Sequence, residues 1–148
     1  MYKKILVAID DSETSRSALA EALHIARTSN AKLYITHVAD ETLLSMHSRT
    51  VSTTLNFDNA KAALAEGGRL LLAEAMKSAT GVEAEALLLE ALDRRVSETL
   101  ADKAKELAID LIVVGRHGRR GLATFILGSV AEQLAKIATA SVLLVRKH

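Results

Sequence analysis

Short apolar runs alternate with longer helical segments along the chain, and this alternation constrains the fold more than any other feature. The first run, residues 5–9, is rich in β-branched residues and stops at a pair of aspartates, as a strand buried on both faces does. Four further runs are interpreted as strands: residues 33–38, 82–89, 111–114 and 141–145. Because strands that alternate with helices pair through right-handed crossovers, the sequence predicts an α/β fold with a mostly parallel sheet.

Helices are predicted between these strands. Asp11 and Ser12, both capping residue types, precede a segment whose apolar residues repeat at helical spacing until Asn30. Two later helices are predicted over residues 94–107 and from about residue 129 to residue 137.

A longer alanine- and leucine-rich helix is predicted from residue 57 to about residue 79, where Gly81 ends it. Gly67 and Gly68 lie inside this helix, and each costs about 1 kcal/mol relative to alanine. Close packing and a kink are both open as explanations for the pair. Residues 40–56 before the helix are polar and weakly patterned, which is typical of a functional or mobile loop.

Composition narrows the classes of function. The 148 residues suit one domain spanning residues 1–148, and the net charge of +1 provides no chain-wide basic field for nucleic acid. The chain has no cysteine, which excludes disulfides, cysteine nucleophiles and zinc–thiolate sites. No apolar stretch reaches the length of about 18 residues that a membrane span needs. The first apolar run stops at Asp10, too soon for a signal peptide. We therefore expect a cytoplasmic protein without nucleic-acid or membrane partners.

The segment after the fourth predicted strand carries the chemistry. Gly115 is followed by two residues and Gly118, then by nine residues and the pair Gly128-Ser129. This pattern begins at the carboxyl end of a strand and closes at the start of a helix. Open α/β sheets bind their ligands at that edge, beside the switch point in strand order.

Phosphate groups need several inward-pointing N–H donors and a close approach of the main chain. Glycine permits both, because it lacks a Cβ and tolerates positive φ. The start of a helix adds free N–H groups and a favourable dipole, and the Ser129 hydroxyl adds a further donor. Arg116 and Arg119 flank the loop and could neutralise charge. The alternative interpretation is a tight strand–helix connection with solvated arginines.

On these residues the sequence resembles the universal stress protein family, in particular its ATP-binding branch. The resemblance rests on residues 4–10, on His37 and Val38, on residues 110–115 and on residues 128–130, and it covers essentially the whole chain. It implies a five-stranded parallel sheet of order 3-2-1-4-5 with helices on both faces. It also implies a homodimer that pairs through the last strand, residues 141–145.

The resemblance also implies the site. Ala8, Ile9, Asp10 and Val38 would form the adenine and ribose pocket. The end of the fourth strand and the phosphate-holding residues would be Val114, Gly115, Arg116, His117, Gly118, Arg119, Gly128, Ser129 and Val130. Whether Mg accompanies the ATP stays open. Asp11 stands where many relatives have glycine, and its carboxylate would repel a triphosphate unless it faces solvent or a metal.

Three other interpretations compete with an ATP-binding regulator. A response-regulator receiver would use Asp10 and Asp11, but it needs a phospho-accepting aspartate after the third strand, where only Asp93 is near. A slow ATP-hydrolysing or nucleotidyl-transferring enzyme could use His117 as an acid, because an imidazole titrates near neutral pH. A dimeric interaction scaffold without nucleotide is the third. The chain lacks the Gly-Lys-Ser/Thr of P-loop enzymes, which predicts slow turnover or none.

The glycine pattern makes a direct prediction. Gly118→Val places a branched side chain where the main chain must meet phosphate, so calorimetric titration should detect no ATP binding by this variant. Unchanged affinity would mean that the segment is only a turn.

Overall fold

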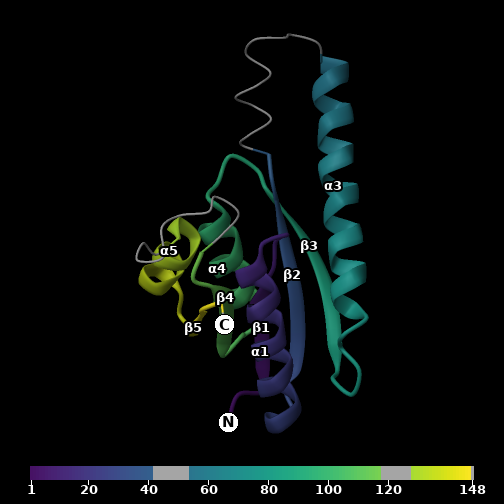
Figure 1. Ribbon diagram of the computed structural model, residues 1–148. Helices are drawn as coiled ribbons and strands as arrows, with labels where there is room; N and C mark the ends of the chain where they lie inside the picture. The colour runs from purple at the N-terminus through teal and green to yellow at the C-terminus, as the bar shows by residue number, and fades with distance from the viewer. Residues whose placement is uncertain (42–53, 118–127, 148) are drawn as a thin grey trace.

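The computed structural model describes residues 1–41, 54–117 and 128–147, and its centre is one parallel sheet (Figure 1). The strand order is β3-β2-β1-β4-β5. The strands are β1 (Lys4–Ala8), β2 (Lys32–Asp40), β3 (Ala84–Ala91), β4 (Leu111–Gly115) and β5 (Ser141–Val145). The α/β class, the parallel pairing and the strand order expected from the family resemblance are all confirmed.

Helices cover both faces of the sheet (Figure 1). The described helices are α1 (Glu13–Ser29), α3 (Thr54–Met76), α4 (Val96–Glu106) and α5 (Ser129–Ile137). α1 and α3 pack on one face, and α4 and α5 pack on the other. Within the described part of the chain, no helix combines the length and apolar character needed to cross a membrane.

β1 lies at the centre of the sheet and faces a core on each side. Ile5 and Val7 belong to the core under α1 and α3, whereas Leu6 belongs to the core under α4 and α5. All three side chains are fully buried. The unbroken apolar run of this strand therefore reflects burial on both faces, as the sequence predicts.

The predicted caps of α1 are confirmed. Ser12 is the N-cap, and its hydroxyl accepts a hydrogen bond from the Ser15 N–H at 3.2 Å. Asn30 is the C-cap and adopts the left-handed conformation, with φ of 54°, which asparagine tolerates better than most residues. These caps fix where the helix begins, directly after the turn that follows β1.

The bounds of α3 differ from the prediction. The helix begins at Thr54 and ends at Met76, several residues before Gly81. The Ser78 hydroxyl donates to the Ala75 carbonyl at 2.7 Å and closes the end of the helix. Gly81, with φ of 75°, serves the turn toward β3 instead.

The two adjacent glycines of α3 have different surroundings. A Cβ on Gly68 would lie 2.7 Å from Leu88 Cδ1 and 2.9 Å from His37 Cδ2, closer than van der Waals contact allows. A Cβ on Gly67 would meet nothing within 4 Å. Close packing of α3 on the sheet therefore explains Gly68, and nothing in the structure explains Gly67.

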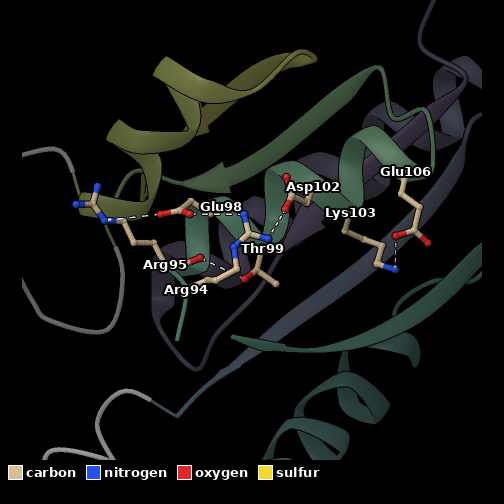
Figure 2. A network of polar contacts seen from close by, with 7 residues as sticks. All are labelled: Arg94, Arg95, Glu98, Thr99, Asp102, Lys103 and Glu106. Atoms are coloured by element: carbon tan, nitrogen blue, oxygen red, sulfur yellow. Dashed lines mark hydrogen bonds and ion pairs between the residues drawn. The ribbon is translucent and has the colours of Figure 1, made fainter. Parts of the chain in front are cut away.

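The outer surface of α4 carries charged side chains that pair with one another (Figure 2). Arg94 contacts Glu98 at 3.5 Å and also contacts Asp102, and Lys103 contacts Glu106 at 2.9 Å. The hydrogen bond to Asp102 raises the pKa of the Arg94 guanidinium. Exposed pairs of this kind contribute little to stability, and they leave this face with balanced charge.

The glycine pair supplies a matched test of packing. Gly67→Ala should raise the free energy of unfolding by about 1 kcal/mol, because alanine is the better helix former. Gly68→Ala gains the same helix propensity but crowds His37 and Leu88, at a cost of about 1–3 kcal/mol. Urea unfolding should therefore find Gly68→Ala no more stable than the unmodified protein. Equal stabilisation by both substitutions would contradict the packing described here.

Candidate functional site

β1 and β4 are neighbours in the sheet, and the order of the strands changes direction between them. The chain runs outward from β1 to β2 and β3, then returns to place β4 on the other side of β1. The segments that follow β1 and β4 consequently diverge from one point at the carboxyl edge of the sheet. That switch point is where open α/β sheets bind their ligands.

The turn after β1 is held by side chains of α1. The Asp10 N–H donates to the Ser15 hydroxyl at 2.8 Å, and Asp10 Oδ1 accepts from the Ser12 N–H at 2.8 Å. An aspartate that accepts from the main chain two residues later is a common device for a tight turn. Asp10 is therefore fixed at the edge of the site, at the point where the chain enters α1.

The end of β4 approaches the first turn of α1 very closely. A Cβ on Gly115 would lie 3.1 Å from both the main-chain carbonyl carbon and the Cβ of Thr14. The Thr14 hydroxyl donates to the His117 carbonyl at 2.6 Å. Gly115 has no positive φ, so close approach, rather than an unusual turn, is what requires glycine here.

The segment between β4 and α5 is closed at its base. The Arg116 carbonyl accepts from the Gly128 N–H at 2.8 Å, and the Arg116 N–H donates to the Val145 carbonyl at 2.8 Å. Gly128 is the N-cap of α5 and provides no side-chain cap. Gly128 has no side chain with which to cap the N–H groups of the first helical turn, and this helix start lies directly beside Arg116.

The predicted site residues divide between the two faces of the sheet. Ala8, Val38, Val114 and Val130 belong to or pack against the core under α4 and α5. Ile9 is buried on the opposite face, in the core under α1 and α3, so only its main chain is near the site. The predicted residues Gly118 and Arg119 lie outside the described residues.

Comparison with known proteins gives a consistent picture. The model of the universal stress protein family matches residues 1–146. The chain belongs to the universal stress protein family. It is 35% identical to universal stress protein YxiE of Bacillus subtilis over 151 aligned residues, covering 99% of this chain and 100% of that protein.

Solved structures of similar proteins agree with this assignment. Hypothetical protein MJ0577 superposes with a TM-score of 0.81 at 25% identity, over 100% of this chain and 98% of the other. A universal stress protein in complex with cAMP superposes with a TM-score of 0.69 at 26% identity, over 99% of this chain and 98% of the other. Some members of the family therefore bind nucleotides, and the receiver alternative finds no support.

Charges of both signs surround the site of this universal stress protein. Asp11 and Glu13 are exposed, and Asp10 is half-buried. Glu13 pairs with Lys147, which follows β5. The hydrogen bond from Lys147, followed by its charge, lowers the pKa of Glu13. A triphosphate can bind nearby only if Asp11 faces solvent or a metal. Asp11 is exposed to solvent.

The side chain of His117 places one ring nitrogen inside the protein beside the candidate site. Among the described residues, this Nδ1 has no hydrogen-bond partner, and the His117 carbonyl accepts from the Thr14 hydroxyl. A ligand at the site could form a hydrogen bond with this nitrogen.

Sequence reasoning missed Thr14 and Ser15 as site residues. Both are buried, and their hydroxyls join the turn after β1 to the end of β4. The signal was present in the hydroxyl-rich run from Ser12 to Ser15, of which only the first residue was assigned a capping role. The described residues contain no cluster of three or more histidine or acidic side chains that could hold a metal ion.

The contact between Gly115 and Thr14 can be tested by substitution. In Gly115→Ala the new methyl group meets main-chain atoms of α1, which cannot rotate away as a side chain can. We expect a loss of about 1–3 kcal/mol in the free energy of unfolding, measured with urea. Gly67→Ala is the control, since it adds the same methyl group in open space. A Gly115→Ala protein of unchanged stability would show that the two segments are not in firm contact.

Proposed function

We propose that this universal stress protein binds ATP at the switch point between β1 and β4 and acts as a regulatory protein of the stress response. One observation carries the proposal. Thr14 ties the first turn of α1 to the segment after β4, and the start of α5, whose N-cap Gly128 has no capping side chain, lies beside that segment. A helix start without a side-chain cap favours a phosphate ligand through its N–H groups and its dipole.

The base would lie on the apolar side of the site. Ala8 and Val130 are half-buried, and Val38 and Val114 line the same face of the sheet. Small aliphatic side chains of this kind pack well against a flat purine ring. Asp10 follows these apolar residues at the edge of the sheet, where its carboxylate can accept hydrogen bonds from ribose hydroxyl groups.

The phosphates would lie toward α5. Ser129 and the main chain of the first turn of α5 would supply donors, Gly128 would allow close approach, and Arg116 would supply a positive charge. Gly115 would contribute indirectly, by letting the first turn of α1 lie against the end of β4. His117 Nδ1, which has no described partner, could bind a phosphate oxygen. Gly118 and Arg119 are assigned to the same role from the sequence alone. Mg could neutralise part of the triphosphate charge, with the phosphates themselves as its main ligands.

The cAMP complex of a 26% identical relative supports a nucleotide as the class of ligand. ATP is preferred here because the glycine pattern and the helix start together provide donors for several phosphates rather than one. The chain lacks the lysine of P-loop enzymes. We therefore propose that the nucleotide is held rather than rapidly hydrolysed.

A second copy of the chain is the partner that we propose for β5. This strand is at one edge of the sheet, and Val142, Leu143 and Leu144 are only partly covered. An apolar edge strand tends to pair with another chain. Since Arg116 is hydrogen-bonded to Val145 at the end of β5, nucleotide binding could bias this pairing.

Titration calorimetry with ATP tests the proposed function, with and without Mg. Binding should be detected at up to millimolar ATP, after refolding from denaturant to remove any nucleotide carried through purification. Parallel titrations with cAMP and GTP identify the preferred ligand. No heat with any nucleotide would refute the proposal, and a clear preference for cAMP would replace ATP as the ligand.

A matched pair of variants locates the phosphates. Ser129→Asp and Ser129→Asn introduce side chains of nearly equal size that differ by one negative charge. A carboxylate at the first residue of α5 favours the helix dipole but repels the phosphates. Ser129→Asp should therefore weaken ATP affinity about tenfold without a fall in Tm, while Ser129→Asn stays close to the unmodified protein. Equal affinities would place the phosphates elsewhere.

A further inference from the structure

His37 lies near the end of β2 and is buried between the sheet and α3. Its side chain is only 6% exposed. The imidazole Nδ1 lies 2.8 Å from the Ile9 carbonyl oxygen. A carbonyl oxygen can only accept a hydrogen bond, so Nδ1 must carry the proton and donate. The ring is therefore held in one tautomer and one orientation.

The hydrogen bond between His37 and Ile9 lies one residue beyond the last paired residues of β1 and β2. The last paired residues are Ala8 and Thr36, and the Ile9 N–H still donates to the Thr36 carbonyl at 2.8 Å. The His37 side chain then supplies a donor for the Ile9 carbonyl. β2 thus holds both main-chain groups of Ile9, one through its backbone and one through a side chain.

The residue that follows Ile9 is Asp10, at the edge of the proposed nucleotide site. Its N–H is bound to the Ser15 hydroxyl, and its carboxylate is bound to the Ser12 N–H. The peptide group between Ile9 and Asp10 carries the carbonyl that His37 holds. Its orientation therefore sets the direction in which the chain leaves the sheet and presents Asp10.

The opposite side of the imidazole rests on α3. A Cβ on Gly68 would lie 2.9 Å from His37 Cδ2, so the ring occupies the space that a side chain there would need. Gly68 is itself buried. The ring consequently lies between the main chain of α3 and the carbonyl of Ile9, the residue after β1. A shift of α3 would therefore displace the ring and, through it, Ile9.

We propose that His37 is a positioning residue for the nucleotide site, which fixes the Ile9–Asp10 peptide group and couples it to α3. This inference rests on the proposed ATP-binding function. A histidine that only filled the core would be replaceable by an apolar side chain. The hydrogen bond to Ile9 gives His37 a role that only a donor at the same place can perform.

His37→Asn and His37→Leu separate these two roles. The amide nitrogen of asparagine is attached to Cγ, as Nδ1 is in histidine, so this variant keeps a donor for the Ile9 carbonyl. Leucine has the same branching and no donor. Both variants lose the ring against Gly68. We expect His37→Leu to weaken Mg-ATP binding by about fivefold to tenfold and His37→Asn to remain within about threefold of the unmodified protein.

Two further measurements accompany the titrations. The imidazole ¹⁵N chemical shifts of the unmodified protein should report an Nδ1–H tautomer for His37 without any ligand. Gly68→Ala should weaken Mg-ATP binding by pressing on the ring, whereas Gly67→Ala should leave the affinity unchanged. If His37→Leu does not fold, the tautomer still tests the hydrogen bond to Ile9, and the glycine pair still tests the coupling to α3.

The outcomes distinguish the inference from the function on which it rests. Absence of binding by the unmodified protein refutes the ATP site itself, and the inference with it. If the unmodified protein binds ATP, equal affinity for His37→Leu and His37→Asn overturns the positioning role. Equal affinity for Gly67→Ala and Gly68→Ala overturns the coupling to α3. An Nε2–H tautomer overturns the hydrogen bond to Ile9.

Discussion

The candidate site depends on how closely the first turn of α1 approaches the end of β4. Gly115 makes this approach possible by having no side chain, and the Thr14 hydroxyl secures it by binding the His117 carbonyl. The pairing of β1 with β4 brings Asp10 and Arg116 to the same edge of the sheet. The contact between Thr14 and His117 then joins the segments that follow these two strands. The strand order of the sheet determines where the site lies, and the contact between Thr14 and His117 fixes how the two segments are placed relative to each other.

Much of the fold could be predicted because its signals are local. Alternating apolar runs identified the strands, and capping residues such as Ser12 and Asn30 located the ends of α1. The bounds of α3 were predicted less well, and at its end the Ser78 hydroxyl binds the Ala75 carbonyl. The sequence left the reason for Gly68 open, because that reason is a contact with β2 and β3, which lie far away in the chain. The strand order came from family resemblance, since spacing alone does not specify which strands become neighbours.

The site was predictable in part for the same reason. The glycine pattern named the residues after β4, and the structure places Gly115, Arg116 and Gly128 together. Thr14 and His37 act through hydrogen bonds to residues far away in the chain, and Ser15 acts through a hydrogen bond to the nearby Asp10. Such roles leave no periodic pattern in a sequence, because threonine, serine and histidine are common residues with many possible partners. Ile9 illustrates the converse: its side chain is buried in the core, and its main chain binds Thr36 and His37.

The central position of β1 also determines when the site can exist. Asp110, just before β4, binds the main chain at the start of β1, and the paired residues Lys4 and Asp110 are 106 positions apart. At about 5–20 residues per second of synthesis, β1 waits several seconds for its second neighbour. Until then the earlier part of the chain can pair β1 with β2, and β2 with β3, but it has no strand for the other edge of β1. A ligand that needs both segments would therefore recognise only a chain in which both are folded. It would stabilise that state by an amount that rises with the logarithm of the ligand concentration once that concentration exceeds the Kd.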